Sequence, residues 1–75
     1  MIIVKVTYTV KAAFADKNQE NINVFIKDFQ ELDSKDFRYS VFVCADKKTF
    51  VHLSWYANEA TQTALLDVAS FKAFQ

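Results

Sequence analysis

The chain has 75 residues, 52% of them hydrophobic, and its nine basic and nine acidic residues cancel to a net charge of zero. That length suffices for one domain, so we expect residues 1–75 to form a single unit. Binding to nucleic acid through its phosphates needs a basic excess, which this chain lacks. Phosphate-cradling and dinucleotide-binding loops need glycine, and the sequence contains none. The composition therefore excludes these two classes of binding site.

The supports that small domains often use are also limited. The single cysteine, Cys44, and the single histidine, His52, cannot form an intrachain disulfide or a four-ligand structural zinc site. No apolar stretch approaches the ~20 residues of a membrane span, and the N-terminus does not resemble a signal peptide. We therefore expect a cytoplasmic protein with no metal, no cofactor and no membrane partner. The apolar surplus of so small a domain favours a homodimer, in which a second copy covers it.

The first half of the chain predicts a strand and a helix. Residues 2–10 alternate in polarity with many β-branched side chains, which is typical of a strand. One face of this strand would carry Ile2, Val4, Val6, Tyr8 and Val10. Apolar residues recur at three- and four-residue intervals from about Phe14 to Leu32, which predicts an amphipathic helix. A polar loop over residues 33–36 ends it.

The second half predicts a hairpin and a second helix. Residues 37–44 and 50–56 alternate as strands, and the short polar turn between them favours antiparallel pairing. Asn58 is a good N-cap for a helix that runs to about Val68, with Leu65, Leu66 and Val68 facing inward. Ser70 can cap a further short turn that carries Phe71 and Phe74. The order β-α-β-β-α predicts an α+β fold.

Four segments resemble one known group of proteins, the dimeric α+β barrel superfamily, and within it the antibiotic biosynthesis monooxygenase-like proteins. Residues 37–41 (FRYSV) resemble the opening of the family's second strand, and residues 49–56 (TFVHLSWY) resemble its third strand. Residues 58–60 (NEA) resemble the start of its second helix, and residues 70–74 (SFKAF) the segment that follows. The likeness covers nearly the whole chain, although each motif is short.

The resemblance implies a ferredoxin-like monomer, with an antiparallel sheet that carries helices on one face. Two copies would pack sheet to sheet as a dimeric barrel, and each would keep a pocket between sheet and helices. Some members oxidise quinols or polyketide aromatics with oxygen and no cofactor, others degrade haem, and many have no known activity. Members usually continue into a fourth strand, and we expect this chain to lack it. The haem-degrading members need a Trp and a His where this chain has Leu65 and Gln75, so haem degradation is not expected.

His52 is the candidate catalytic residue, because a histidine has a pKa near working pH and could act as a general base toward a phenolic substrate. The alternative is a strand residue with no chemical role. Tyr56 and Trp55 are neighbours on one strand and point to opposite faces. Either could line a pocket for a flat apolar ligand, or both could be ordinary core.

Three further residues are candidates for the pocket. Phe42 could add to its aromatic enclosure, and Tyr8 could point a polar group into it or serve as an ordinary strand residue. Arg38 could hold a carboxylate or phenolate, or could pair with an acid across a dimer interface.

Two functions stay open. The first is a cofactor-free monooxygenase acting on a small aromatic or quinol-type substrate, with His52 as the base and an aromatic, water-poor enclosure. The second is a non-catalytic dimeric module that binds a small apolar ligand or serves only as an oligomeric protein. The fold alone does not choose between them, because function depends on the site.

Overall fold

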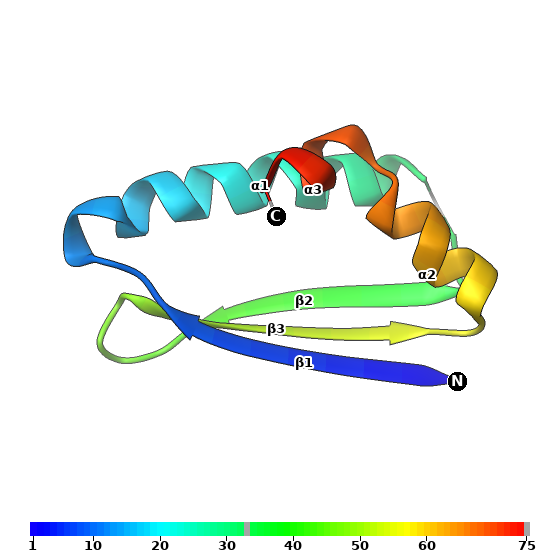
Figure 1. The fold of residues 1–75 in the computed structure, drawn as a ribbon, viewed down its shortest axis with the longest axis horizontal. Helices are drawn as coiled ribbons and strands as arrows, with labels where there is room; N and C mark the ends of the chain where they lie inside the picture. The colour runs from blue at the N-terminus through cyan, green and yellow to red at the C-terminus, as the bar shows by residue number, and fades with distance from the viewer. Residues whose placement is uncertain (33, 75) are drawn as a thin grey trace.

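The computed structural model describes residues 1–32 and 34–74. Their elements follow in the order β1 (Ile2–Thr9), the short 3-10 helix η1 (Ala12–Phe14), α1 (Ala15–Glu31), β2 (Phe37–Val43), β3 (Thr49–Tyr56), α2 (Glu59–Leu66) and α3 (Ala69–Phe74). Figure 1 shows two layers, with the sheet in one and all the helices in the other. The α+β fold predicted from the sequence is confirmed, and its order of elements is compatible with a ferredoxin-like arrangement.

Within the described residues the sheet has the strand order β1-β3-β2, and both outer strands run antiparallel to β3. Tyr56, the last residue of β3, pairs with Ile2 of β1 on one side and with Phe37 of β2 on the other. The three strands are therefore level at this end of the sheet. The predicted hairpin is therefore present. Its strands start and end within one residue of the predicted bounds, because the alternation of polarity marks strands well.

The turn between β2 and β3 has to reverse the chain without glycine. Lys47 takes the left-handed conformation, with φ of 63°, that glycine usually occupies. The Asp46 carboxylate accepts hydrogen bonds from the backbone N–H groups of Lys48 and Thr49, at 3.0 and 2.8 Å. The Thr49 hydroxyl donates a third bond, at 2.6 Å, to the same carboxylate. This bond contributes most, and the two backbone bonds contribute less, to holding the pKa of Asp46 below its usual value. These bonds hold the turn closed.

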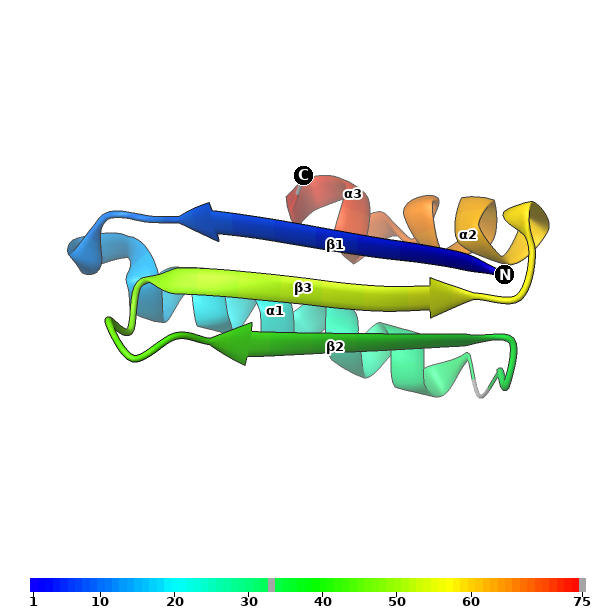
Figure 2. The same ribbon diagram turned by 90° about the horizontal axis from the view of Figure 1, so that it is seen from below.

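One face of the sheet is covered and the other is bare. Figure 2 views the sheet from its bare side, with α1 behind β2 and β3, and with α2 and α3 on the side of β1. On the covered face, α1 buries Ile22, Phe25 and Phe29 against the sheet, as its apolar stripe predicts. Phe14 was expected in this stripe but is exposed, because it precedes the first turn of α1 as its N-cap residue.

The second helix is shorter than predicted. Asn58 caps α2 as expected, and its side chain accepts a hydrogen bond from the Thr61 N–H at 2.9 Å. The helix ends at Leu66, however, and the chain turns before α3 begins. Leu65 is buried in the core and Val68 packs against it. Leu66 also lies on the sheet side of α2, although it is 41% exposed because it lies near the edge of the sheet.

The turn between α2 and α3 lets a third helix close over the sheet. Phe71 is buried and Phe74 is half-buried against the core. Ser70 was expected to cap this segment, but it lies inside α3 and donates a hydrogen bond of 2.6 Å to the Asp28 carboxylate on α1. That bond ties α3 to α1. Of the predicted loop over residues 33–36, Asp33 lies outside the described residues.

Among residues 1–32 and 34–74, no helix combines the length and the apolar character needed to cross a membrane.

Candidate functional site

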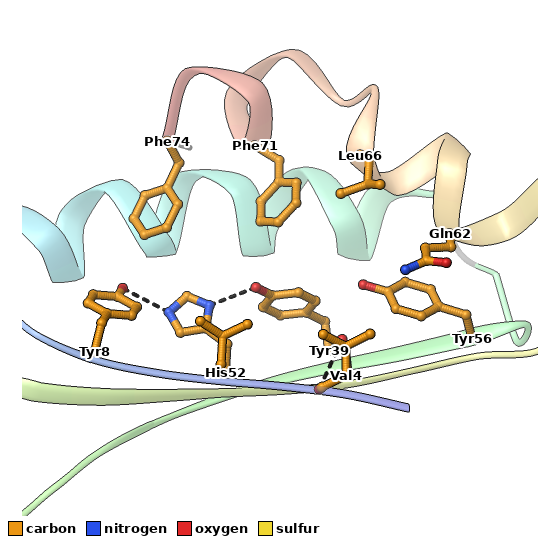
Figure 3. Close-up of a pocket in the computed structure, with 11 residues that line it drawn as sticks. Val4, Tyr8, Tyr39, His52, Tyr56, Gln62, Leu66, Phe71 and Phe74 are labelled. Atoms are coloured by element: carbon orange, nitrogen blue, oxygen red, sulfur yellow. Dashed lines mark hydrogen bonds between the residues drawn. The ribbon is translucent and has the colours of Figure 1, made fainter. Parts of the chain in front are cut away.

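A cavity of about 270 Å³ lies between the sheet and the helices α2 and α3 (Figure 3). Its floor comes from all three strands: Val4, Val6 and Tyr8 from β1, Tyr39 from β2, and His52, Ser54 and Tyr56 from β3. Its roof consists of Gln62, Leu66, Phe71 and Phe74. Val6 and Leu66 are exposed, so the cavity opens between the β1 edge and α2. It lies just below the usual size range of small-molecule pockets, which suits a ligand of one or two rings.

His52 is held between two tyrosines on the cavity floor. The Tyr8 hydroxyl lies 2.9 Å from His52 Nε2, and the Tyr39 hydroxyl lies 2.6 Å from His52 Nδ1. Asn18 on α1 extends the chain, because its Nδ2 donates to the Tyr8 hydroxyl at 3.0 Å. Figure 3 shows the imidazole between the two phenol rings, with a dashed line to each. Four side chains from α1 and the three strands thus form one hydrogen-bonded cluster.

The register of the sheet explains this cluster. Tyr8 lies opposite Phe50, two residues before His52, and Tyr39 lies opposite Ser54, two residues after it. Both tyrosines are therefore diagonal neighbours of His52 on the same face, at a separation that aromatic side chains can span. Alternation alone places these residues on one face. The pairing of strands places them next to one another.

Burial sets the protonation states of the cluster. His52 is only 5% exposed, and its loss of solvation lowers its pKa below the usual value. Burial raises the pKa of Tyr39 well above its usual value, and the neighbouring phenols Tyr56 and Tyr8 raise it further. Burial also raises the pKa of Tyr8, although the hydrogen bond from Asn18 works against that shift. At neutral pH the cluster therefore holds a neutral imidazole and two protonated phenols.

The cavity is apolar and carries no formal charge. No Asp, Glu, Lys or Arg is among the described residues that line it. Taking a charged ligand out of water without a countercharge is costly, so the site favours an uncharged one. The aromatic rings of the walls offer stacked and edge contacts to a planar ligand. Among the described residues there is also no group of three His, Cys, Asp or Glu side chains placed to hold a metal ion.

The structure brings together three of the predicted site residues and separates three others. His52, Tyr8 and Tyr56 all line the cavity. Phe42, Trp55 and Arg38 instead lie on the bare face. Arg38 and Trp55 face each other across β2 and β3, and both line a shallow hollow there.

Several lining residues were not predicted. Tyr39 completes the histidine cluster, and Phe71 and Phe74 form part of the roof. The signal for Tyr39 was available, because the short turn between β2 and β3 limits their register. The roof could not be foreseen, since it depends on the long-range packing of α3 against α1 and the core. At the two positions relevant to haem degradation, Leu65 is a core residue, and Gln75 lies outside the described residues.

The bare face carries an exposed apolar strip. Ile3, Phe42 and Leu53 are 65%, 54% and 42% exposed, and half-buried Val51 and Trp55 lie beside them on the same face. These five residues are called the bare-face strip below. Contiguous exposed apolar surface on a small protein commonly marks an interaction site.

No family model, no curated protein sequence and no solved structure matches this chain. The resemblance to the antibiotic biosynthesis monooxygenase-like proteins therefore stays a prediction, and the function has to be argued from the site itself.

Proposed function

We propose that this chain binds a small, uncharged aromatic molecule in the cavity between its sheet and the helices α2 and α3. The observation that carries the proposal is the wall of this cavity, which is largely aromatic and lacks formal charge around a neutral His52. Burying a ring there removes apolar surface from water, at roughly 25 cal/mol per Å². The few polar groups on the floor can orient the ligand.

A titration with two ligands of similar shape tests this proposal. Acetophenone is neutral and benzoate is an anion at neutral pH, so we expect acetophenone to bind in calorimetry and benzoate not to bind. Leu66→Trp should weaken the binding, because the larger side chain lies at the mouth of the cavity. Thr63→Trp on the exposed side of α2 is the matched control and should bind as wild type does. Equal binding of the two ligands, or an equal effect of the two variants, would contradict the proposal.

A second candidate function is cofactor-free oxygenation of a quinol-type substrate, the activity that the family resemblance implies. The observation in its favour is that neutral His52 lies in a hydrogen-bonded chain with Tyr8 and Tyr39, where an imidazole can accept a proton. A quinol that gives up a proton becomes electron-rich enough to reduce dioxygen itself, which would make a metal or flavin unnecessary. In this reading His52 is the general base, and the walls exclude water.

Oxygen uptake with a panel of quinols tests the second candidate. Wild type should consume oxygen faster than the buffer control, and His52→Gln should reduce the rate because the amide cannot accept the proton. Tyr56→Phe keeps the ring in the cavity and leaves His52 in place, so it serves as the control. Equal uptake by wild type and His52→Gln would show that His52 is not the base. If ligands bind but no oxygen is consumed, the oxygenase function is refuted and only the binding function remains.

We further propose a homodimer in which the bare-face strip of one copy packs on that of another, as in a dimeric α+β barrel. Ile3, Phe42 and Leu53 are exposed, and a second copy packed on this face would cover them. A stable interface of this kind usually buries ~1,200–2,000 Å². Sedimentation at micromolar concentration should give a dimer for wild type and a monomer for Leu53→Lys. A clean wild-type monomer would refute the proposal.

The exposed thiol of Cys44 favours a reducing compartment, so we propose the cytoplasm.

A further inference from the structure

We infer that the ligand of this cavity carries a hydrogen-bond-accepting oxygen, as in an aryl ketone, an aryl aldehyde or a quinone. This inference rests on the proposed binding function and specifies its ligand class. The oxygen would lie at the His52 end of the cavity and accept a hydrogen bond from a phenol. The donors and acceptors of the cluster formed by Asn18, Tyr8, His52 and Tyr39 do not balance.

A neutral imidazole carries one N–H, so it donates through one nitrogen and accepts through the other. His52 makes one hydrogen bond through each nitrogen, and both partners are phenol hydroxyls. One tyrosine must therefore donate its proton to His52, while the other accepts from His52 and keeps its own proton unused. Because Asn18 presents its amide nitrogen and not its oxygen to Tyr8, the cluster leaves one phenol O–H without an acceptor among its own members.

The free proton belongs to a different tyrosine in each tautomer. If Nδ1 carries the proton, it donates to Tyr39, and Tyr8 donates to Nε2. The hydrogen bonds then run in one direction from Asn18 to Tyr39, and the Tyr39 proton is free. If Nε2 carries the proton, Tyr8 accepts from both Asn18 and His52, and the Tyr8 proton is free. Both tyrosines line the cavity, so the proton is available to a ligand in either case.

No other acceptor within residues 1–32 and 34–74 takes this proton. A donor without an acceptor loses part of its solvation when it is half-buried, as both tyrosines are. Aromatic rings also lie close to this end of the cavity. The Phe74 ring lies 5.8 Å from the His52 ring, and the Phe71 ring lies 5.7 Å from that of Tyr39. Figure 3 shows the two phenyl rings above this end of the floor.

A carbonyl oxygen meets this need better than a hydrocarbon or an ion. It accepts a hydrogen bond from the free phenol O–H, it brings no charge into a cavity without countercharges, and it is attached to a ring that the apolar walls can hold. The ring would lie over Val4 and Val6 and beneath Leu66, which line the more open part of the cavity. The site is thus built to recognise an acceptor-bearing aromatic compound.

Infrared spectroscopy tests the inference directly. Acetophenone labelled with ¹³C at its carbonyl should show a stretching band at lower frequency when bound than in an alkane, because a phenol donates to its oxygen. α-Methylstyrene has the same shape with a methylene group in place of the oxygen. After correction for their different transfer from water to octanol, which itself offers hydrogen bonds, acetophenone should bind about 2- to 10-fold more tightly, the range expected for one net hydrogen bond.

Two variants, Tyr39→Phe and Tyr8→Phe, identify the phenol that donates to the ligand. The tautomer of His52, measured by NMR, predicts which of the two phenols it is. His52 is the only histidine, so ¹⁵N-histidine labelling reports its tautomer without ambiguity. A proton on Nδ1 requires the carbonyl band to move back toward its alkane position in Tyr39→Phe. A proton on Nε2 requires the same change in Tyr8→Phe. Tyr56→Phe is the control, because it removes a phenol that also lines the cavity but lies outside the cluster.

The possible results distinguish failure of this inference from failure of the proposed binding function. The inference is supported if the carbonyl band of bound acetophenone has a lowered frequency in wild type. The frequency should rise again in the Tyr→Phe variant that the His52 tautomer indicates, and not in Tyr56→Phe. A bound acetophenone with its band at the alkane position overturns the inference and leaves the binding function standing, even if no variant folds. Recovery only in Tyr56→Phe, or in the wrong tyrosine, also overturns it. Failure of both ligands to bind overturns the proposed function itself.

Discussion

Phe25 is the residue on which the packing of the helices over the sheet most depends, and Phe25→Ala should be among the most damaging single changes. Its side chain is 0% exposed. Its ring centre lies 4.9 Å from those of Phe71 and Phe74, and 5.3 and 5.6 Å from those of Phe29 and Tyr39. Truncation of a buried Phe to Ala usually costs about 3–5 kcal/mol. A chain of this size has a stability of only about 4–11 kcal/mol, so the change removes a large share of it.

Urea unfolding followed by circular dichroism measures this cost. For so small a domain the slope is about 1 kcal/mol per M, so the midpoint should fall by about 3 M or more. Val24→Ala is the matched control, because Val24 is adjacent on α1 but exposed, and should change stability by less than about 0.5 kcal/mol. Both variants have to be compared at one protein concentration, since dimerisation adds to apparent stability. A loss of less than about 1 kcal/mol for Phe25→Ala would refute the packing described for α1 and α3.

Three further predictions concern other parts of the chain. Burial lowers the pKa of His52 in the folded state. As the pH drops below about 6.5, the unfolded chain therefore takes up a proton on His52 more readily than the folded chain does, and the free energy of unfolding falls. Urea midpoints at about pH 7.5 and pH 5.5 should differ more for wild type than for His52→Gln, and equal differences would contradict this. Asn58→Ala removes the cap of α2 and should cost about 1 kcal/mol in thermal unfolding, whereas Asn58→Asp should cost little. Lys47→Gly should leave the stability unchanged or raise it by up to about 1 kcal/mol, because glycine adopts a φ of 63° without strain. A marked loss in Lys47→Gly would show that the turn is held differently.

Most of the secondary structure could be predicted because local pattern determines it. The alternation in β1, β2 and β3 and the three- and four-residue spacing in α1 are each visible without knowledge of the rest of the chain. The sequence also predicted a break near Val68, and α2 ends at Leu66. The packing of the segment after the break could not be predicted in the same way. Phe71 and Phe74 lie against the core and Ser70 beside Asp28, and these are long-range contacts that no local pattern encodes.

The site was predictable only in part, for a related reason. Alternation places His52, Tyr56 and Tyr8 on the same face once the strands are paired, but it does not say which face the helices cover. Aromatic character alone then favoured Trp55 and Phe42 as lining residues, although both lie on the bare face. The central strand gives no clear signal, because β3 carries Phe50 and Tyr56 on the covered face and Val51, Leu53 and Trp55 on the bare one. The composition of β3 alone therefore could not separate the inside of the monomer from the outside.

The position of β1 in the sheet has a consequence for how this protein behaves at high concentration. In the described residues β1 pairs with β3 along one edge only, and its sequence, IIVKVTYT, is rich in residues that form strands. A run of this kind can stack with identical copies into a fibril with a repeat of about 4.8 Å. Lys5 is exposed in the middle of the strand, so such a stack would bring ammonium groups within that same spacing of one another. Their mutual repulsion makes this single side chain a guard against amyloid formation, and replacing it with an apolar residue would remove the one charge in the strand.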